Sequence, residues 1–302
     1  MRLQGETWEQ DIYPILLGSR ARYVRSVLPA GALVSAATAW LRFGKSIFST
    51  PYFAAVEQSG SLVLPETAVH SFLCDHLRFI ARFYLEMAEM IEARREVIKP
   101  KLLRRLELRL GGLEAALSAG RGVLVPTIQT SVPLRILFAN FPRGTRYNLL
   151  LHRQNAGIPE ILRKADQSWN FLFLEDAPGR HVINALRRGE VVICNIDHAY
   201  PKTEVTLAPV LGHAAIVPSG VFRVAHRFGS LVVPLTFAEE GGKVMMSAET
   251  VFDWNATDEL PVAQMLERIQ PILDQAVLRA PACWFGWGNL TNRWRAWKEL
   301  CP

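Results

Sequence analysis

Short apolar runs alternate with amphipathic stretches from about residue 106 to about residue 249 of the chain. The runs EVVICNI and GVLV are apolar throughout, which is typical of parallel strands buried on both faces. Stretches of about ten residues with helical spacing separate such runs, as in βαβ units. The pattern therefore predicts an α/β fold with a mostly parallel central sheet flanked by helices, in an αβα arrangement.

The N-terminal part predicts helices broken by Pro and Gly. The stretch LPAGALVSAATAWL is too short and too interrupted to span a membrane, so we expect a buried or surface-lying helix. Apolar spacing from Ala68 to Val97 predicts a long helix that stops at Pro100, and another is expected from Asp258 to Leu278. We expect one domain over 1–302, with a helical region at 1–65 and an α/β body at 66–302.

Composition limits which partners and which cellular compartment we expect. A net charge of +6 and a pI near 9.3 favour an acidic partner such as an anionic membrane surface, an acidic carrier protein or a phosphorylated cofactor. Zinc-knuckle, RRM and helix-turn-helix patterns are lacking, so no nucleic acid is expected. The four scattered cysteines and the polar N-terminus indicate reduced thiols in a cytoplasmic protein.

Two segments allow different interpretations. HSFLCDH contains metal-capable groups, but His76 does not follow Cys74 at helical spacing, and we expect no metal site. The tail WFGWGNLTNRWRAWKEL mixes Trp with Arg and Lys, as interfacial segments do. A C-terminal helix packed on the body through its tryptophans explains the tail equally well.

The stretch GVLVPTIQTSVPLRIL predicts a buried strand, a turn and the start of a helix. Ligands of α/β proteins bind at such junctions, beyond the carboxyl ends of strands. Yet the turn holds Gln129, Thr130 and Ser131, with no histidine, carboxylate or cysteine.

Three blocks resemble the late acyltransferases of lipid A synthesis, the lauroyl/myristoyl transferase family. They are GGLEAALSAGRGVLVPTIQ, ALRRGEVVICNIDHAYP and LGHAAIVPSGVFRVAHRFGSLVVPL, in the order and spacing of that family. The resemblance implies transfer of a fatty acyl group from an acyl carrier protein or coenzyme A thioester to a hydroxyl or amine, with no tightly bound cofactor. It also implies a His-x-x-x-x-Asp/Glu dyad in the turn after the first core strand.

This chain departs from that dyad. In register, Gln129 stands where the family has histidine, and Leu134 stands near the position of the carboxylate. An amide is not a useful base. If the turn has lost its catalytic role, Gln129→Ala should retain most activity, whereas a large loss would indicate an oxyanion donor.

His198 is the candidate replacement base, because it follows the strand EVVICNI at the expected ligand edge. The pair Asp197-His198 stands where the resembled family has Asp-Gln. Asp197 is expected to hold a neighbouring backbone group or an Arg, and Glu175 or Asp176 could orient the imidazole instead. The alternative is that His198 is a loop histidine with a structural hydrogen bond.

The resemblance also suggests substrate-binding residues. Arg153, next to His152 in LHRQ, is a candidate for a phosphate or pantetheine group, or else an ion-pair partner. Ser219 and Gly220 match the family's Thr-Gly before a helix, where capping is the alternative to oxyanion binding. Arg223 lies at a position where the family also carries Arg.

Two functions remain open from the sequence. The first is a divergent acyltransferase of a lipid or secondary-metabolite pathway, cytoplasmic or peripheral on the cytoplasmic face of a bacterial inner membrane. The second is a catalytically silent partner subunit that binds an acyl chain or an acyl carrier protein.

Overall fold

The computed structural model describes residues 30–43, 51–130, 141–142, 144–151, 161, 163–164, 169–197, 204–240, 243–254 and 261–300. The helix expected to start in the stretch GVLVPTIQTSVPLRIL lies outside these ranges.

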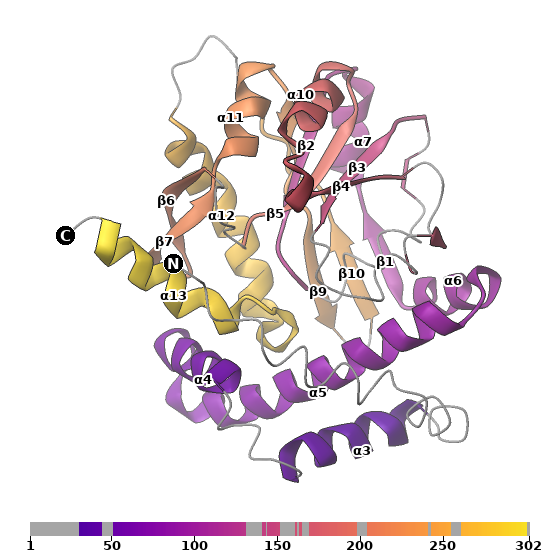
Figure 1. Ribbon diagram of the computed structural model, residues 1–302, viewed down its shortest axis with the longest axis vertical. Coiled ribbons are helices and arrows are strands. Elements are labelled where there is room, and N and C mark those ends of the chain that lie inside the picture. Colours follow the sequence, from indigo (N-terminus) through magenta and orange to yellow (C-terminus); the bar gives the residue numbers. More distant parts are fainter. Residues whose placement is uncertain are drawn as a thin grey trace.

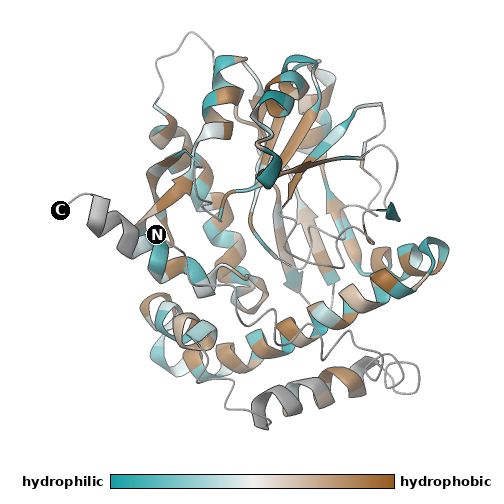
Figure 2. Ribbon diagram, in the orientation of Figure 1, coloured by the Kyte–Doolittle hydropathy of each residue, from teal (hydrophilic) through white to brown (hydrophobic). Residues whose placement is uncertain are grey.

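A five-stranded, all-parallel sheet forms the centre of the fold, in the order β4-β3-β5-β2-β8. Its strands are β2 (Val123–Thr127), β3 (Tyr147–Leu151), β4 (Trp169–Phe173), β5 (Val191–Asn195) and β8 (Leu231–Val232). The two runs with continuous apolar sequence supply β2 and β5, which pair with each other in the interior of the sheet. The predicted fold class is confirmed, and Figure 2 shows the hydrophobic character of these central strands.

Side chains at alternate strand positions pack into two hydrophobic cores, one on each face of the sheet. Leu124 and Val192 pack with α10 (Gly179–Arg187), α11 (Gly220–Arg227) and α12 (Val262–Arg279). Val123 and Val191 pack with α6 (Arg95–Leu103) and α7 (Gly111–Ser118). Figure 1 shows α10 and α11 side by side at the top of the molecule.

Two smaller sheets accompany the central one. β1 (Leu106–Arg109) pairs in parallel with β10 (Lys243–Ser247), which pairs antiparallel with β9 (Thr236–Glu240). β6 (Val205–Val210) and β7 (His213–Pro218) form an antiparallel hairpin. The apolar run LVVPLTF (residues 231–237) is divided between β8 and β9. Pro234 lies in the gap and has no N–H to donate to a continuous ladder.

Helices from both ends of the chain lie together under the sheet. They are α3 (Ala30–Phe43), α4 (Pro51–Val63), α5 (Glu66–Glu92) and α13 (Trp287–Leu300), and Figure 1 shows α5 running along the base of the molecule. The short 3₁₀ turns η2 (Leu174–Asp176) and η3 (Pro281–Cys283) precede α10 and α13. None of the helices in the described ranges has both the length and the apolar character needed to cross a membrane.

The predicted stop of the long helix at Pro100 was wrong. α5 already ends at Glu92, and Pro100 lies inside α6. Ala93 is extended, and the Lys164 ammonium donates hydrogen bonds to the carbonyl oxygens of Met90, Ile91 and Ala93. This lysine comes from a distant part of the chain and satisfies the last carbonyls of α5, so periodicity alone could not locate the break.

Candidate functional site

The turn after β2 is held by its backbone on two sides. The Gln129 N–H donates to Asp197 Oδ2 over 2.6 Å, and the Gln129 carbonyl accepts from the Phe285 N–H over 3.0 Å. The Ile196 N–H, next to Asp197, donates to the Thr127 carbonyl over 2.9 Å. This bond extends the contact between the β2 and β5 segments beyond the last strand residue of β5. Gln129 is therefore fixed at the carboxyl edge of the sheet, where α/β proteins bind ligands.

Asp197 joins three segments of the chain through one buried carboxylate. Its side chain is 4% exposed, and Oδ2 accepts a second hydrogen bond from Trp284 Nε1 over 2.7 Å. Oδ1 makes no hydrogen bond to any residue in the described ranges. Bonds from N–H groups to a charged acceptor are stronger than neutral ones, so this carboxylate anchors the turn and the C-terminal segment together.

A buried arginine balances the charge of this region. Arg293 in α13 is 4% exposed, and its Nε donates to the Ile216 carbonyl over 3.0 Å. Burial lowers the pKa of Arg293, while the charges of Asp197 and Asp274 act in the opposite direction. Asp274 accepts hydrogen bonds from the Leu211 N–H and the Gln270 amide. The buried carboxylates thus lie in the field of a buried cation, which offsets part of their desolvation cost.

Residues 281–285, which we call the C-terminal strap, cover the turn. Trp284 forms an isolated antiparallel bridge with Thr130. The Phe285 ring packs against Phe79 and Phe83 of α5, with ring centroids 4.9 Å apart in each case. Trp284 and Trp287 are 2% and 0% exposed, so the tail packs on the body through these tryptophans. The strap thereby connects the turn to α5.

The side chain of His76, in the HSFLCDH segment, lies between α4, α5 and the strap. It is completely buried, with Nδ1 2.8 Å from the Ala282 carbonyl of the strap and Nε2 2.9 Å from the Tyr52 hydroxyl. Because a carbonyl only accepts, Nδ1 carries the hydrogen and Nε2 accepts from Tyr52. Burial lowers the pKa of His76 to about 4. Within the described ranges, no three His, Cys, Asp or Glu side chains form a group that could hold a metal.

The predicted Ser219–Gly220 site carries an acidic neighbour. Ser219 occupies the N-cap position of α11, but its hydroxyl does not cap the helix, and its buried oxygen has no partner among the described residues. A Cβ on Gly220 would stand 3.7 Å from a carboxylate oxygen of Glu204, and Glu204 forms an ion pair with Arg223. A carboxylate thus already lies at this helix start, and an incoming anion would have to replace it.

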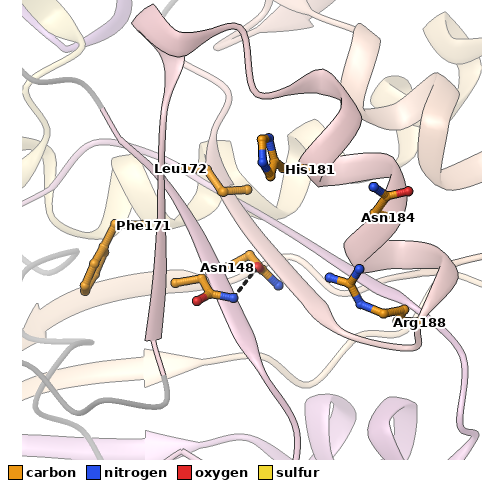
Figure 3. Close-up of a pocket in the computed structure, with 7 residues that line it drawn as sticks. Asn148, Phe171, Leu172, His181, Asn184 and Arg188 are labelled. Atoms are coloured by element: carbon orange, nitrogen blue, oxygen red, sulfur yellow. Dashed lines mark hydrogen bonds between the residues drawn. The ribbon is translucent and has the colours of Figure 1, made fainter.

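A separate pocket lies between α10 and the edge of the sheet (Figure 3). It has a volume of about 250 Å³ and is lined by Asn148, Asn170, Phe171, Leu172, His181, Asn184 and Arg188. The Asn170 amide donates to Asn148, and the Asn148 amide and Arg188 both donate to Glu190. The pocket therefore adjoins a hydrogen-bonded polar network that includes Asn148 of β3 and Asn170 of the edge strand β4.

The structure brings together only some of the residues selected from the sequence. Gln129 and Asp197 are in direct contact, whereas Glu175 and Asp176 follow the edge strand β4, two strands away from β5. Four positions selected from the sequence lie outside the described residues: Leu134, His152, Arg153 and His198.

Sequence reasoning missed Trp284, Phe285 and Arg293 as parts of this region. The abundance of Trp and Arg in the tail was the available signal, and it did not indicate which of these side chains would reach the carboxyl edge of the sheet.

Comparison with known proteins bears on the second half of the chain. The model of the bacterial lipid A biosynthesis acyltransferase family matches residues 146–296, which is half of the chain. The match includes β3, β5, the β6–β7 hairpin, α11, α12 and the strap. A search of curated proteins finds no match. The chain belongs to the bacterial lipid A biosynthesis acyltransferase family.

Proposed function

We propose that the protein transfers an acyl group from an acyl carrier protein or coenzyme A thioester to an amine or hydroxyl acceptor in a lipid or secondary-metabolite pathway. Membership of the lipid A acyltransferase family carries this proposal. The parallel sheet supports it, because ligands of such folds bind beyond the carboxyl ends of the strands, and β2 and β5 end side by side there.

In the proposed reaction the acceptor nitrogen or oxygen attacks the thioester carbonyl carbon, and the carbonyl π pair moves to oxygen. His198 takes the acceptor proton. When the carbonyl re-forms, the carbon–sulfur bond breaks, and the thiolate receives the proton from the imidazolium. The products are the acylated acceptor and the free thiol.

Asp197 has a holding role in this proposal. Its Oδ2 atom is occupied by the Gln129 N–H and the Trp284 indole, and its side chain is buried. These bonds hold Asp197, which precedes His198 in the sequence. We therefore assign Asp197 a positioning role and assign the proton transfer to His198.

The donor is expected to approach as an acidic carrier protein or as a phosphorylated coenzyme. The net charge of +6 favours both, and it favours association with an anionic membrane surface on the cytoplasmic side. Arg153, His152, Ser219, Gly220 and Arg223 are proposed to contact the substrates; Arg223 would do so only after release from Glu204.

The first prediction tests His198 directly. With acyl-loaded carrier protein and a panel of amines and alcohols, His198→Ala should lower kcat by about 10²–10⁴-fold, since a positioned base contributes roughly that much. The rate of the unaltered protein should fall at acidic pH, because a protonated imidazole cannot accept a proton. Product formation is measured by intact mass, and thiol release gives the rate.

His70→Ala is the matched control, because His70 is an exposed histidine on α5. It should leave both kcat and the pH profile unchanged. Full activity of His198→Ala at every pH would remove His198 from the mechanism.

A second candidate function is a catalytically silent subunit that binds an acyl chain or a carrier protein. The observation in its favour is the turn itself, whose residues 129–134 include no histidine, carboxylate or cysteine. Gel filtration with acyl carrier protein separates the two candidates when it is combined with the transfer assay. Stable binding without product across the acceptor panel would support the silent subunit.

A further inference from the structure

The carboxamide of Gln129 is the one part of this residue that the fold leaves available. Both backbone groups are bonded, to Asp197 and to Phe285, while the side chain is partly exposed. Within the described ranges the carboxamide makes no hydrogen bond. A side-chain amide has two N–H donors and no useful basicity. Gln129 thus offers a side-chain donor on a backbone that is fixed at the edge of the sheet.

We propose that the Gln129 carboxamide donates a hydrogen bond to the thioester carbonyl oxygen and stabilises the oxyanion that forms when the acceptor attacks. This assignment rests on the proposed acyl transfer. In the first step the new bond to carbon forms, the π pair moves to oxygen, and Gln129 Nε2–H holds the resulting negative charge. The proton leaves the acceptor to a separate base.

The fixed backbone of Gln129 limits the positions that its side-chain amide can reach, which favours this role. An oxyanion donor is effective when it is held in place before the reaction, because no reorganisation is then needed in the transition state. Here a buried carboxylate holds the N–H at 2.6 Å, and the strap holds the carbonyl at 3.0 Å. The strap is in turn fixed by aromatic packing on α5.

The nearby carboxylate of Asp197 would oppose an oxyanion if its charge were uncompensated. Oδ2 accepts two N–H bonds, and the buried Arg293 contributes a favourable charge interaction with Asp197. These contacts offset part of the charge of Asp197, which reduces its repulsion of a negative charge that develops beside Gln129. In this proposal, the turn supplies an oxyanion-binding group and the base comes from elsewhere.

The experiment compares Gln129→Met with the unaltered protein. Methionine has a similar length and leaves the two backbone hydrogen bonds intact, but it cannot donate. We expect kcat to fall by about 10²–10³-fold with little change in the KM for the donor, which is the usual effect of losing one oxyanion-hole donor. Gln264→Met on the exposed side of α12 is the matched control and should behave as the unaltered protein.

An infrared measurement makes the test independent of turnover. The carbonyl stretch of a ¹³C-labelled acyl-coenzyme A should lie at lower frequency when bound to the unaltered protein than when bound to Gln129→Met. A shift without any transfer would support the hydrogen bond from Gln129 to the thioester carbonyl and contradict the proposed transferase. Transfer with equal kcat and equal carbonyl frequency in both proteins would overturn the role of Gln129 and leave the transferase standing. Absence of donor binding would overturn both.

Discussion

At the scale of single residues, His76 shows how burial decides the chemistry of a side chain. Its sequence neighbours suggest a polar helix face, but both ring nitrogens are used by the fold, and rings of Tyr52, Phe72 and Phe79 stack beside it. Desolvation disfavours the charged imidazolium and lowers the pKa to about 4. His76 is thus a neutral structural link between α4, α5 and the strap.

This lowered pKa makes stability depend on pH. The unfolded chain takes up a proton near the ordinary histidine pKa of 6.5, whereas the folded protein resists protonation down to about 4. The contribution of neutral His76 is complete above pH 6.5 and is lost as pH falls towards 4, by about 3 kcal/mol. We expect the free energy of unfolding to decrease over this interval, as measured by urea denaturation.

The control for this prediction is His76→Gln, which does not titrate and can still donate to the Ala282 carbonyl. The variant should show a flatter dependence of stability on pH between 6.5 and 4. Equal slopes in the two proteins would contradict the assignment of the acid sensitivity to His76.

At the scale of elements, the C-terminal strap unites the turn after β2, the end of β5 and α5. It contributes a backbone bond through Phe285, a bridge through Trp284 and an indole bond to Asp197. Three hydrogen bonds of the strap reach residues remote in sequence, namely Gln129, Asp197 and His76. Its stability and the geometry of the turn should change together.

Two buried tryptophans allow this coupling to be measured. Trp284→Phe removes the N–H bond to the Asp197 carboxylate, and Trp287→Phe removes an N–H bond of the same length, 2.7 Å, to the Pro281 carbonyl. Losing a bond to a charged group costs more than losing one to a neutral group, so Trp284→Phe should destabilise by about 1 kcal/mol more. Denaturant unfolding gives both values.

Amide hydrogen exchange at Gln129 provides the second readout. Trp284→Phe should accelerate this exchange, because the carboxylate that accepts the amide bond is then less constrained. Trp287→Phe should leave it slow. Equally slow exchange at Gln129 in both variants would contradict the coupling between the strap and the turn.

At the scale of the whole molecule, the N-terminal helices pack against the last helix of the chain. The Ser59 hydroxyl donates to the Trp287 carbonyl over 2.9 Å, and α4 lies against α13. A Cβ on Gly288 would stand 2.3 Å from a ring carbon of Tyr52. This close approach links α4 to α13, and from it we predict that these helices unfold together with the α/β body.

Gly288→Ala tests this packing. The added methyl group must displace the Tyr52 ring, and overpacking of this kind costs about 1–3 kcal/mol. Gly31→Ala in α3 is the control, because a Cβ there meets nothing within 4 Å, and it should cause no loss. In both variants we expect circular dichroism and tryptophan fluorescence to report one coincident transition. Separate transitions would indicate that the helices and the α/β body unfold independently.

The alternation of buried strands with amphipathic helices was sufficient to determine the α/β class and the parallel sheet, because strands buried on both faces need continuous apolar runs. The same reasoning placed Gln129 and Asp197 at strand ends. It could not show that they touch, since strand order is set by tertiary pairing: β2 and β5 lie far apart in sequence and adjacent in the sheet.

Only the tertiary structure decided how α5 ends, where His76 points and what covers the turn. Lys164, Ala282 and Phe285 reach these sites from segments distant in sequence, and local pattern carries no information on such contacts. The residue type at position 129 was set by the sequence, whereas its fixed backbone and available amide follow from hydrogen bonds supplied by β5 and the strap.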